Sequence, residues 1–277
     1  MKKKSFNSYY ILLIVFLIGL SLLLYPTVAD RWNALHQSRA IVQYTEGLQN
    51  LDPSLFDEYF QAAYAFNDDI GKRPNPYLLS EAERAKYETL LSVDDSGIIC
   101  YIDIPTITTT LPVYHSTAET VLQVAIGHIE WSSLPVGGEG SHCVLSGHRG
   151  LPSARLFTDL DKLVVGDLFY INVLNETLAY EVDQILIVEP DDTEALRVQE
   201  GKDYCTLVTC TPYGINTHRL LVRGHRINLE EDSVLRVVSD AAQVDTTLVS
   251  ILIAIPLLAL LVLGFMVDDS IKRKYLR

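Results

Sequence analysis

One cysteine at the end of an apolar run is the residue in this sequence best placed for covalent chemistry. Cys210 closes the run Thr-Leu-Val-Thr-Cys at residues 206–210, and Arg219 follows nine positions later. A cysteine at the end of a strand is half exposed, and nearby cationic groups favour its thiolate, the form that attacks carbonyl groups. The pattern therefore predicts a nucleophile with a guanidinium beside it that can donate hydrogen bonds to an anion.

A general base has to come from another part of the chain. His148 follows the apolar run 141–145 and lies in the block Gly-His-Arg-Gly at residues 147–150. Glycines give the backbone the freedom to aim an imidazole ring, and imidazole titrates near neutral pH. This context favours His148 over six other histidines: His36, His115, His128, His142, His218 and His225.

Two further arginines compete with Arg219 for the role of cationic partner. Arg149 follows His148 directly, and Arg223 lies four residues beyond Arg219. Because side chains alternate along a strand, Arg219 and Arg223 belong to one face, so geometry read from the sequence does not separate them.

These segments resemble the sortases, membrane-held cysteine transpeptidases of Gram-positive bacteria. The family signature is a Thr-Leu-x-Thr-Cys strand with an arginine eight or nine residues later, and this spacing selects Arg219. The resemblance is greatest to class C, the pilin-polymerising branch. It extends through residues 126–152, where Leu-Pro-Val-Gly-Gly-Glu-Gly at 134–140 leads into the Gly-His-Arg-Gly block, and it covers about half of the chain.

The resemblance implies a fold and a reaction. The fold is mainly β, a sortase-type closed eight-stranded barrel with N-terminal helices, flanked by two transmembrane helices. Cys210 would attack a Leu-Pro-x-Thr-Gly-like sorting signal between Thr and Gly, His148 would protonate the leaving amine, and Arg219 would steady the substrate or the oxyanion. A lysine of another pilin subunit would resolve the thioester, without any cofactor. The partners would be pilins or other surface proteins that bear the signal.

A loop with two prolines is the third feature that the resemblance interprets. In class C sortases a lid with an Asp-Pro-aromatic motif covers the catalytic cysteine, and Asn75, Pro76 and Tyr77 occupy the equivalent place within the loop 71–79. Asparagine in place of aspartate provides a neutral hydrogen bond where the family has a charge, so an ionic latch is not expected. The alternative is an ordinary proline-rich connector.

Two apolar segments predict membrane spans. Residues 9–24 are just long enough to cross a bilayer, and residues 248–267 contain no charge. Basic tails at 1–8 and 268–277 place both termini in the cytoplasm by the positive-inside rule, with the catalytic part outside the cell. A cleaved signal peptide is the alternative for the first segment.

The segment between the two spans divides by pattern into three parts. Residues 25–96 are predicted to be helical, with Asp52-Pro53 at one helix start and a Ser80/Glu83 capping box at another. Residues 97–229 contain seven or eight short β-rich runs, which is typical of a closed antiparallel or mixed barrel. Residues 230–247 are predicted to be an acidic helix or linker.

Composition narrows the range of partners. The formal net charge of −13 argues against nucleic acid as a ligand.

Four cysteines allow three disulfide pairings, but none is expected, because buried free cysteine behaves as a small hydrophobic residue and the chain can form a core without cross-links.

Three alternatives to a pilin-polymerising enzyme stay open. Within the family, a housekeeping sortase would attach surface proteins to peptidoglycan. A metal site would use nitrogen and sulfur ligands, but the spacing of these residues matches no C-x-x-C or H-E-x-x-H pattern. A noncatalytic membrane-tethered adhesion or scaffold domain would lack a reactive cysteine.

Overall fold

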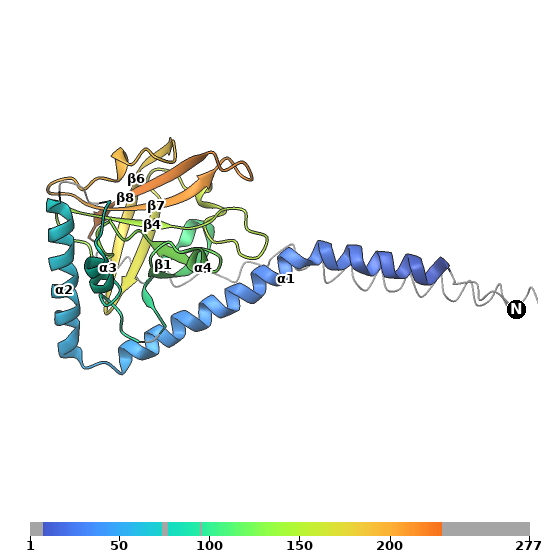
Figure 1. The fold of residues 1–277 in the computed structure, drawn as a ribbon, viewed down its shortest axis with the longest axis horizontal. Helices are drawn as coiled ribbons and strands as arrows, with labels where there is room; N and C mark the ends of the chain where they lie inside the picture. The colour runs from blue at the N-terminus through green and yellow to red at the C-terminus, as the bar shows by residue number, and fades with distance from the viewer. Residues whose placement is uncertain (1–7, 74–76, 95, 229–277) are drawn as a thin grey trace, which may run out of the picture. The chain divides into compact units, whose positions relative to one another are not determined.

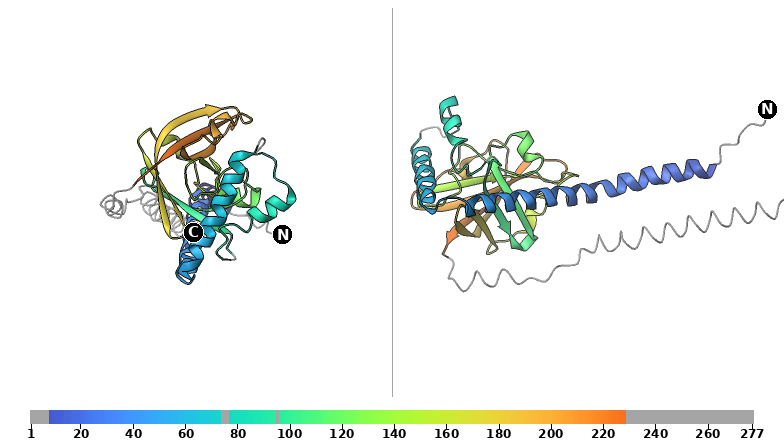
Figure 2. Two further views of the ribbon diagram at one scale, coloured as in Figure 1. Left: turned by 90° about the vertical axis from the view of Figure 1, so that its left-hand side faces the viewer. Right: turned by 90° about the horizontal axis from the view of Figure 1, so that it is seen from below.

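The computed structural model describes residues 8–228 except 74–76 and 95. Three helices lead into the barrel: α1 (Ser8–Gln49), α2 (Pro53–Lys72) and α3 (Glu81–Tyr87) (Figures 1 and 2). A fourth, α4 (Glu119–Leu122), is a single turn between two strands. Three short 3-10 helices lie in connections at Pro105–Ile107, Leu160–Lys162 and Glu194–Leu196.

Eight strands close into one barrel in the order β1-β2-β3-β4-β7-β8-β6-β5. The pairs β2/β3 and β4/β7 are parallel and the others are antiparallel. The bounds are β1 Ile98–Ile104, β2 Thr109–His115, β3 Ile126–His128, β4 Ser141–Ser146, β5 Leu168–Val173, β6 Glu176–Val188, β7 Asp203–Thr211 and β8 His218–Ile227.

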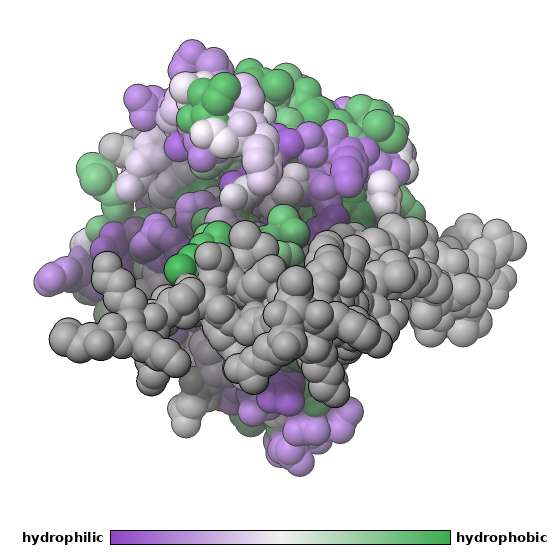
Figure 3. Space-filling view, turned by 90° about the vertical axis from the view of Figure 1, so that its right-hand side faces the viewer, coloured by the Kyte–Doolittle hydropathy of each residue, from purple (hydrophilic) through white to green (hydrophobic). Residues whose placement is uncertain are grey.

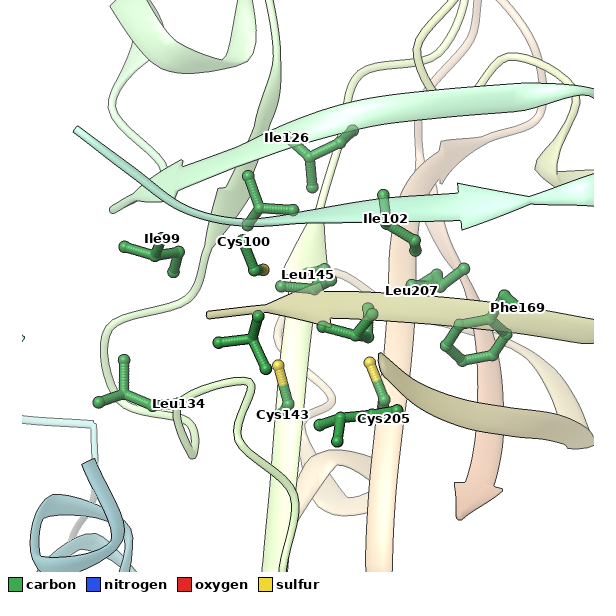
Figure 4. Packing of buried hydrophobic residues seen from close by; sticks show 14 of the residues in the cluster. Ile99, Cys100, Ile102, Ile126, Leu134, Cys143, Leu145, Phe169, Cys205 and Leu207 are labelled. Carbon is green, nitrogen blue, oxygen red and sulfur yellow. The ribbon is translucent and has the colours of Figure 1, made fainter. Parts of the chain in front are cut away.

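The barrel interior holds the main hydrophobic core. Figure 4 shows the sulfur atoms of Cys143 and Cys205 among aliphatic side chains, with Cys100 close by and Phe169 at one end. Cys143 and Cys205 are register partners on β4 and β7. Burial raises the pKa of all three thiols, because a thiolate is poorly solvated inside a core. These cysteines are structural and unsuited to attack a substrate.

A second, smaller apolar cluster lies outside the barrel core. Its buried members come from β4, β7, β8 and the connection between β6 and β7: Val144, Leu196, Val208 and Leu221. Trp131, which follows β3, packs against them. Because Val208 is two residues before Cys210 in the same strand, this cluster shares a sheet face with the cysteine.

The helices begin where the sequence predicts. Asp52 caps α2 by accepting a hydrogen bond from the Ser54 amide at 3.0 Å, and proline occupies its first turn. Ser80 and Glu83 form the predicted capping box of α3. The α1 helix is longer than the predicted span, because it continues through Pro26 and docks on the barrel beyond it. There the Tyr44 hydroxyl donates to Ile99 O at 3.2 Å.

The closed eight-stranded barrel and its N-terminal helices confirm the predicted fold class. The three-residue strand β3 was absent from the predicted runs, because three residues carry too little periodicity to be recognised. Among the described residues, one helix, over Leu13–Gln49, is long and apolar enough to cross a membrane. The second predicted span, 248–267, lies outside the described residues, as do the tail 268–277, the linker 230–247 and all of the first tail, 1–8, except Ser8, which begins α1.

Candidate active site

The predicted nucleophile and the predicted cationic residue are register partners. Cys210 on β7 pairs with Arg219 on β8 in the antiparallel ladder. Residues that stand directly opposite in such a ladder project from the same face with closely spaced Cβ atoms. Cys210 is partly exposed, in contrast to the other three cysteines. The Arg219 guanidinium is held at the strand end, where Nη1 donates to His218 O at 3.1 Å and to Asn216 O at 3.3 Å.

The predicted base lies on the other side of the same strand. The parallel pair β4/β7 ends with Ser146 opposite Val208. Beyond it the Gly147 amide donates to Val208 O at 3.0 Å, and the Thr209 hydroxyl donates to Gly147 O at 2.8 Å. Continuing this register by two residues brings the His148 backbone level with Cys210. The central strand β7 therefore carries the cysteine between the histidine segment and the arginine strand.

Two neighbours fix how the histidine segment is held. Gly147 has no room for a side chain, because a Cβ there would lie 2.5 Å from Ile126 Cδ1 and 2.8 Å from Phe157 Cδ2. The Phe157 amide donates to His148 O at 3.2 Å. The Glu119 carboxylate, on α4, lies 3.9 Å from His148 Nε2, so an acidic group faces the ring of the predicted base.

One of the two rival arginines is engaged away from Cys210. Arg223 makes a bidentate ion pair with Asp183, at 2.9 and 3.0 Å, and its guanidinium lies 4.2 Å from the centroid of the Tyr204 ring. Its register partner on β7 is Thr206, four residues before the cysteine. The geometry therefore separates Arg223 from Arg219, which strand alternation alone could not do.

Arg149 joins the two halves of the site. Its side chain is only 10% exposed and forms an ion pair with Asp161. Nη1 donates to the Thr211 hydroxyl at 3.4 Å, and the guanidinium lies 5.8 Å from the centroid of the Tyr213 ring. Because Arg149 follows His148 and Thr211 follows Cys210, one side chain links the segments that carry the two reactive groups.

The other histidines with buried rings have structural partners. His128 Nε2 donates to Ser133 O at 2.8 Å and its Nδ1 pairs with the Tyr87 hydroxyl at 2.9 Å. His142 Nδ1 donates to Arg197 O at 3.1 Å and its Nε2 pairs with the Thr206 hydroxyl at 2.7 Å. Desolvation lowers the pKa of both rings to about 4, so they are neutral at physiological pH.

Tyr77 lies against the outer apolar cluster. Its hydroxyl pairs with the Thr193 hydroxyl at 2.7 Å, and its ring meets the Trp131 ring edge-on with centroids 4.9 Å apart. Tyr77 also lines a cavity of about 210 Å³, together with Arg73, Trp131, His142 and other residues. The other two predicted lid residues, Asn75 and Pro76, lie outside the described residues.

No group of three or more His, Cys, Asp or Glu side chains within the described part of the chain is placed to hold a metal ion. The His142 ring and the Cys205 thiol, which could supply a nitrogen and a sulfur ligand, take part instead in a hydrogen-bonded pair and in the barrel core.

Known proteins share this arrangement. A family described as Sortase domain matches residues 102–227. Sortase C1 of Streptococcus agalactiae is 50% identical, with a TM-score of 0.68 over 69% of this chain and 100% of that one. The chain belongs to the sortase family, in its class C branch. A sortase C structure from Streptococcus pneumoniae is 44% identical, with a TM-score of 0.63 over 69% of this chain and 97% of that one.

More distant sortases are found among curated relatives. Sortase A of Bacillus anthracis is 32% identical over 133 residues, which make up 48% of this chain and 61% of that protein. Sortase D of Bacillus subtilis is 31% identical over 135 residues, 48% of this chain and 64% of that protein. The sortase described here thus spans less than two thirds of the length of these two relatives.

Sequence reasoning missed two carboxylates at this sortase site. Glu119 and Asp161 belong to connections that carry no motif, and only the fold brings them to His148 and Arg149. The alternation of acidic and basic residues over 155–162 indicates local ion pairs, but nothing in it points to Arg149 as the partner of Asp161.

Proposed function

We propose that this sortase is a membrane-anchored cysteine transpeptidase that joins pilin subunits through a lysine side chain. The observation that carries the proposal is the position of Cys210 on β7, with Arg219 directly opposite on β8 and His148 following β4 on the other side. A nucleophile, a proton carrier and an anion-binding donor on three adjacent strands are the groups that acyl transfer requires.

The first half-reaction forms an acyl-enzyme. The Cys210 thiolate attacks the carbonyl carbon of Thr in a Leu-Pro-x-Thr-Gly-like signal, and the negative charge moves to the carbonyl oxygen. Arg219 donates hydrogen bonds to that oxygen or to the substrate backbone beside it. As the C–N bond breaks, protonated His148 gives its proton to the departing Gly amine, and a thioester remains on the cysteine.

The second half-reaction transfers the acyl group to an amine. Neutral His148 removes a proton from the ε-ammonium of a pilin lysine, and the free amine attacks the thioester carbonyl. As the C–S bond breaks, the attacking nitrogen releases its second proton to water, the thiolate returns to Cys210, and an isopeptide bond joins the two chains. His148 ends the cycle protonated, ready for the next signal peptide.

The surface beside the cysteine suits the apolar part of such a signal. The outer cluster, with Val144, Val208 and Leu221, shares the sheet face of Cys210. Its members are buried, and once the residues that cover them move, the cluster offers apolar contacts for Leu and Pro side chains. The Streptococcus pneumoniae sortase C structure is described as informative about pilin substrate specificity. Membership of the same branch supports a pilin as the substrate of this chain.

The contacts of Tyr77 are evidence for the proposed lid. Its contacts with Trp131 and Thr193 hold the loop over the face that a signal peptide would occupy. A lid is also named for a related protein, since one solved structure is a lid mutant of sortase A from Corynebacterium diphtheriae, 40% identical with a TM-score of 0.61. We assign the residues Asn75, Pro76 and Tyr77 to a lid that has to move before substrate enters.

The α1 helix supports membrane anchoring, because its first half is apolar and exposed. The proposed topology has both termini in the cytoplasm and the barrel outside the cell, with residues 248–267 as a second span. Basic residues before the first segment and after the second support this topology.

The test is a transfer assay with the full chain in detergent micelles. A Leu-Pro-x-Thr-Gly peptide and a candidate pilin are incubated with wild type, Cys210→Ala and, as matched control, Cys205→Ala, which removes a core thiol. We expect a lysine-linked peptide–pilin product, identified by mass spectrometry, with wild type and the control only. Product formation by Cys210→Ala would overturn the proposal.

A further inference from the structure

The loop that follows His148 is tied to α1 just beyond the apolar segment. The Arg155 amide donates to Asp30 Oδ1 at 2.8 Å, and Asn33 Nδ2 donates to Ser153 O at 2.7 Å. Both α1 residues point to the same short stretch of the β4–β5 connection. These contacts fix where the barrel begins relative to the membrane anchor.

The segment of α1 between its apolar part and these contacts, named here the α1 tether, is short whatever the angle of the helix. Leu24 ends the apolar segment, and Asp30 is six residues further on. Six residues span about 9 Å as α-helix and about 20 Å fully extended. The headgroup layer on each side of a bilayer adds roughly 5–8 Å to the hydrocarbon core. A bend at Pro26 would therefore change the tilt of the barrel without moving the loop far from the lipid surface.

The same loop touches the strand end that carries the cysteine. A Cβ on Gly150 would lie 2.9 Å from Cε2 of the Tyr213 ring, and the Arg149 guanidinium stacks near that ring. Tyr213 belongs to the β7–β8 connection, which begins after Thr211, the residue that follows Cys210. The active-site end of β7 and the α1 tether thus contact opposite ends of one seven-residue stretch, 149–155.

Exposed side chains at this end have the character of a membrane interface. In the β7–β8 connection, Tyr213 is 60% and Ile215 68% exposed. In the β4–β5 connection, the Arg155 and Lys162 side chains are 66% and 63% exposed. Aromatic, aliphatic and basic side chains in combination are typical of surfaces that meet lipid headgroups. Figure 3, which views the molecule from the right-hand side of Figure 1, shows hydrophobic and hydrophilic residues together on the surface.

The net charge of residues 149–162 and 212–218 differs in sign from that of the whole chain. Residues 149–162 contain three basic and two acidic side chains, and residues 212–218 contain no acidic one. The chain as a whole has a formal net charge of −13. An anionic bilayer would therefore repel most of the surface more strongly than this end.

We infer that residues 149–162 and 212–217, named here the membrane-facing rim, contact the surface of the bilayer that holds α1. The inference rests on the membrane anchoring in the proposed function and adds an orientation to it. Cys210 then works at the lipid surface, where a sorting signal on a membrane-held precursor would be presented, and the rest of the barrel points away from the membrane.

The test measures how close two engineered tryptophans come to lipid. The full chain with Trp32→Phe and Trp131→Phe, which removes both native tryptophans, receives either Tyr213→Trp in the rim or Tyr64→Trp as matched control. The Tyr64 hydroxyl contacts Val136 O at 3.4 Å, near the start of β4 and away from the rim. Each protein is reconstituted into vesicles of phosphatidylcholine and phosphatidylglycerol, with and without brominated acyl chains that quench indole fluorescence.

We expect brominated lipid to quench Tyr213→Trp at least threefold more strongly than Tyr64→Trp. Equal quenching of the two, in protein that floats with the vesicles, would overturn the inference and leave the anchoring intact. Failure of the protein to float with the vesicles would overturn the anchoring itself. A second variant, Ile215→Ser with Lys162→Glu, should lower the rate on a lipid-anchored signal peptide about fivefold relative to a soluble one. An unchanged ratio would contradict the inference.

Discussion

Cys210 and Arg219 stand directly opposite each other on β7 and β8, in a non-terminal pair of the barrel's ladder. The pairing continues to Thr211 and His218, so the ladder holds the Arg219 backbone directly beside the Cys210 backbone. The relationship does not depend on a flexible loop. The histidine segment, in contrast, reaches the site just beyond the end of its strand, where hydrogen bonds outside the ladder and side-chain contacts hold it.

Arg219 and Arg223, both on β8, should have different effects when each is truncated. Arg219→Ala should lower kcat/KM about 100-fold or more with little change in Tm, because it removes a donor to the reacting group. Arg223→Ala should lower the free energy of unfolding by roughly 1–3 kcal/mol, because it leaves the partly buried Asp183 carboxylate without its bidentate partner. Steady-state kinetics and thermal unfolding check both; a destabilised but fully active Arg219→Ala would reverse the assignment.

Gly147 should not tolerate even a methyl group. In Gly147→Ala the new Cβ meets Ile126 and Phe157, so we expect a loss of roughly 1–3 kcal/mol in unfolding free energy and slower turnover as the His148 segment shifts. Gly71→Ala is the control, since its Cβ would find only ordinary contacts at 3.8 Å or more inside α2. Thermal unfolding should leave the control unchanged or slightly more stable; equal behaviour of the two variants would rule out the steric argument.

Releasing Tyr77 should expose the nucleophile. Tyr77→Ala removes the contacts with both Trp131 and Thr193, whereas Thr193→Val removes only the hydroxyl partner. We expect the rate of Cys210 modification by a thiol reagent to rise several-fold in Tyr77→Ala and less in Thr193→Val. Intact-mass spectrometry follows the reaction. The same rate in wild type and both variants would remove the lid from the account.

Arg149 should affect the rate by holding the His148 and Cys210 segments in position. Arg149→Met removes the links to Asp161, Thr211 and Tyr213, and we expect kcat to fall about tenfold with little change in KM. Arg149→Lys should recover only part of the rate, because an ammonium cannot reproduce the forked contacts of a guanidinium. Arg155→Met, which removes an ion pair with Asp159 at a largely exposed arginine, is the matched control. Its activity in solution should equal that of wild type. Full recovery by lysine would show that charge alone matters at this position.

Acid should destabilise the fold through two neutral histidines. The folded-state pKa of His128 and of His142 is lowered to about 4, below the ordinary value of 6.5. Between these values the unfolded chain binds protons that the folded chain does not, so stability is complete above pH 6.5 and falls as the pH drops toward 4. Each ring contributes up to about 1.4 kcal/mol per pH unit.

The measurement is the midpoint of unfolding at a series of pH values, for wild type and His142→Gln. Glutamine cannot become charged, so the slope between pH 4.5 and 6 should be shallower in the variant, whatever its absolute stability. A slope that stays the same would show that His142 does not contribute to the acid sensitivity.

The sequence was sufficient for features that depend on local pattern. Alternating apolar runs predicted seven of the eight strands, and the Asp52 cap and the Ser80/Glu83 box predicted two helix starts. The three-residue strand β3 and the continuation of α1 through Pro26 were missed, because neither leaves a periodic signal or a break that the residues reveal.

Features that depend on long-range pairing needed the structure. Strand alternation alone could not separate Arg219 from Arg223, since both belong to one face of β8, and only the spacing of the resembled family favoured Arg219. The register with β7 places Arg219 opposite Cys210 and Arg223 opposite Thr206. Glu119 and Asp161 reach the site from connections far away in sequence. The roles of the three predicted residues in catalysis stay predictions until the chemistry is measured.

The most direct test of the account is the mass of the enzyme during the reaction. The full chain is mixed with a Leu-Pro-x-Thr-Gly peptide without any amine acceptor, quenched in acid and analysed intact, followed by peptide mapping. The account predicts a mass increase equal to the acyl part of the peptide, located on Cys210, released by hydroxylamine and absent in Cys210→Ala. An acyl group on another residue, or peptide cleavage by Cys210→Ala, would contradict it.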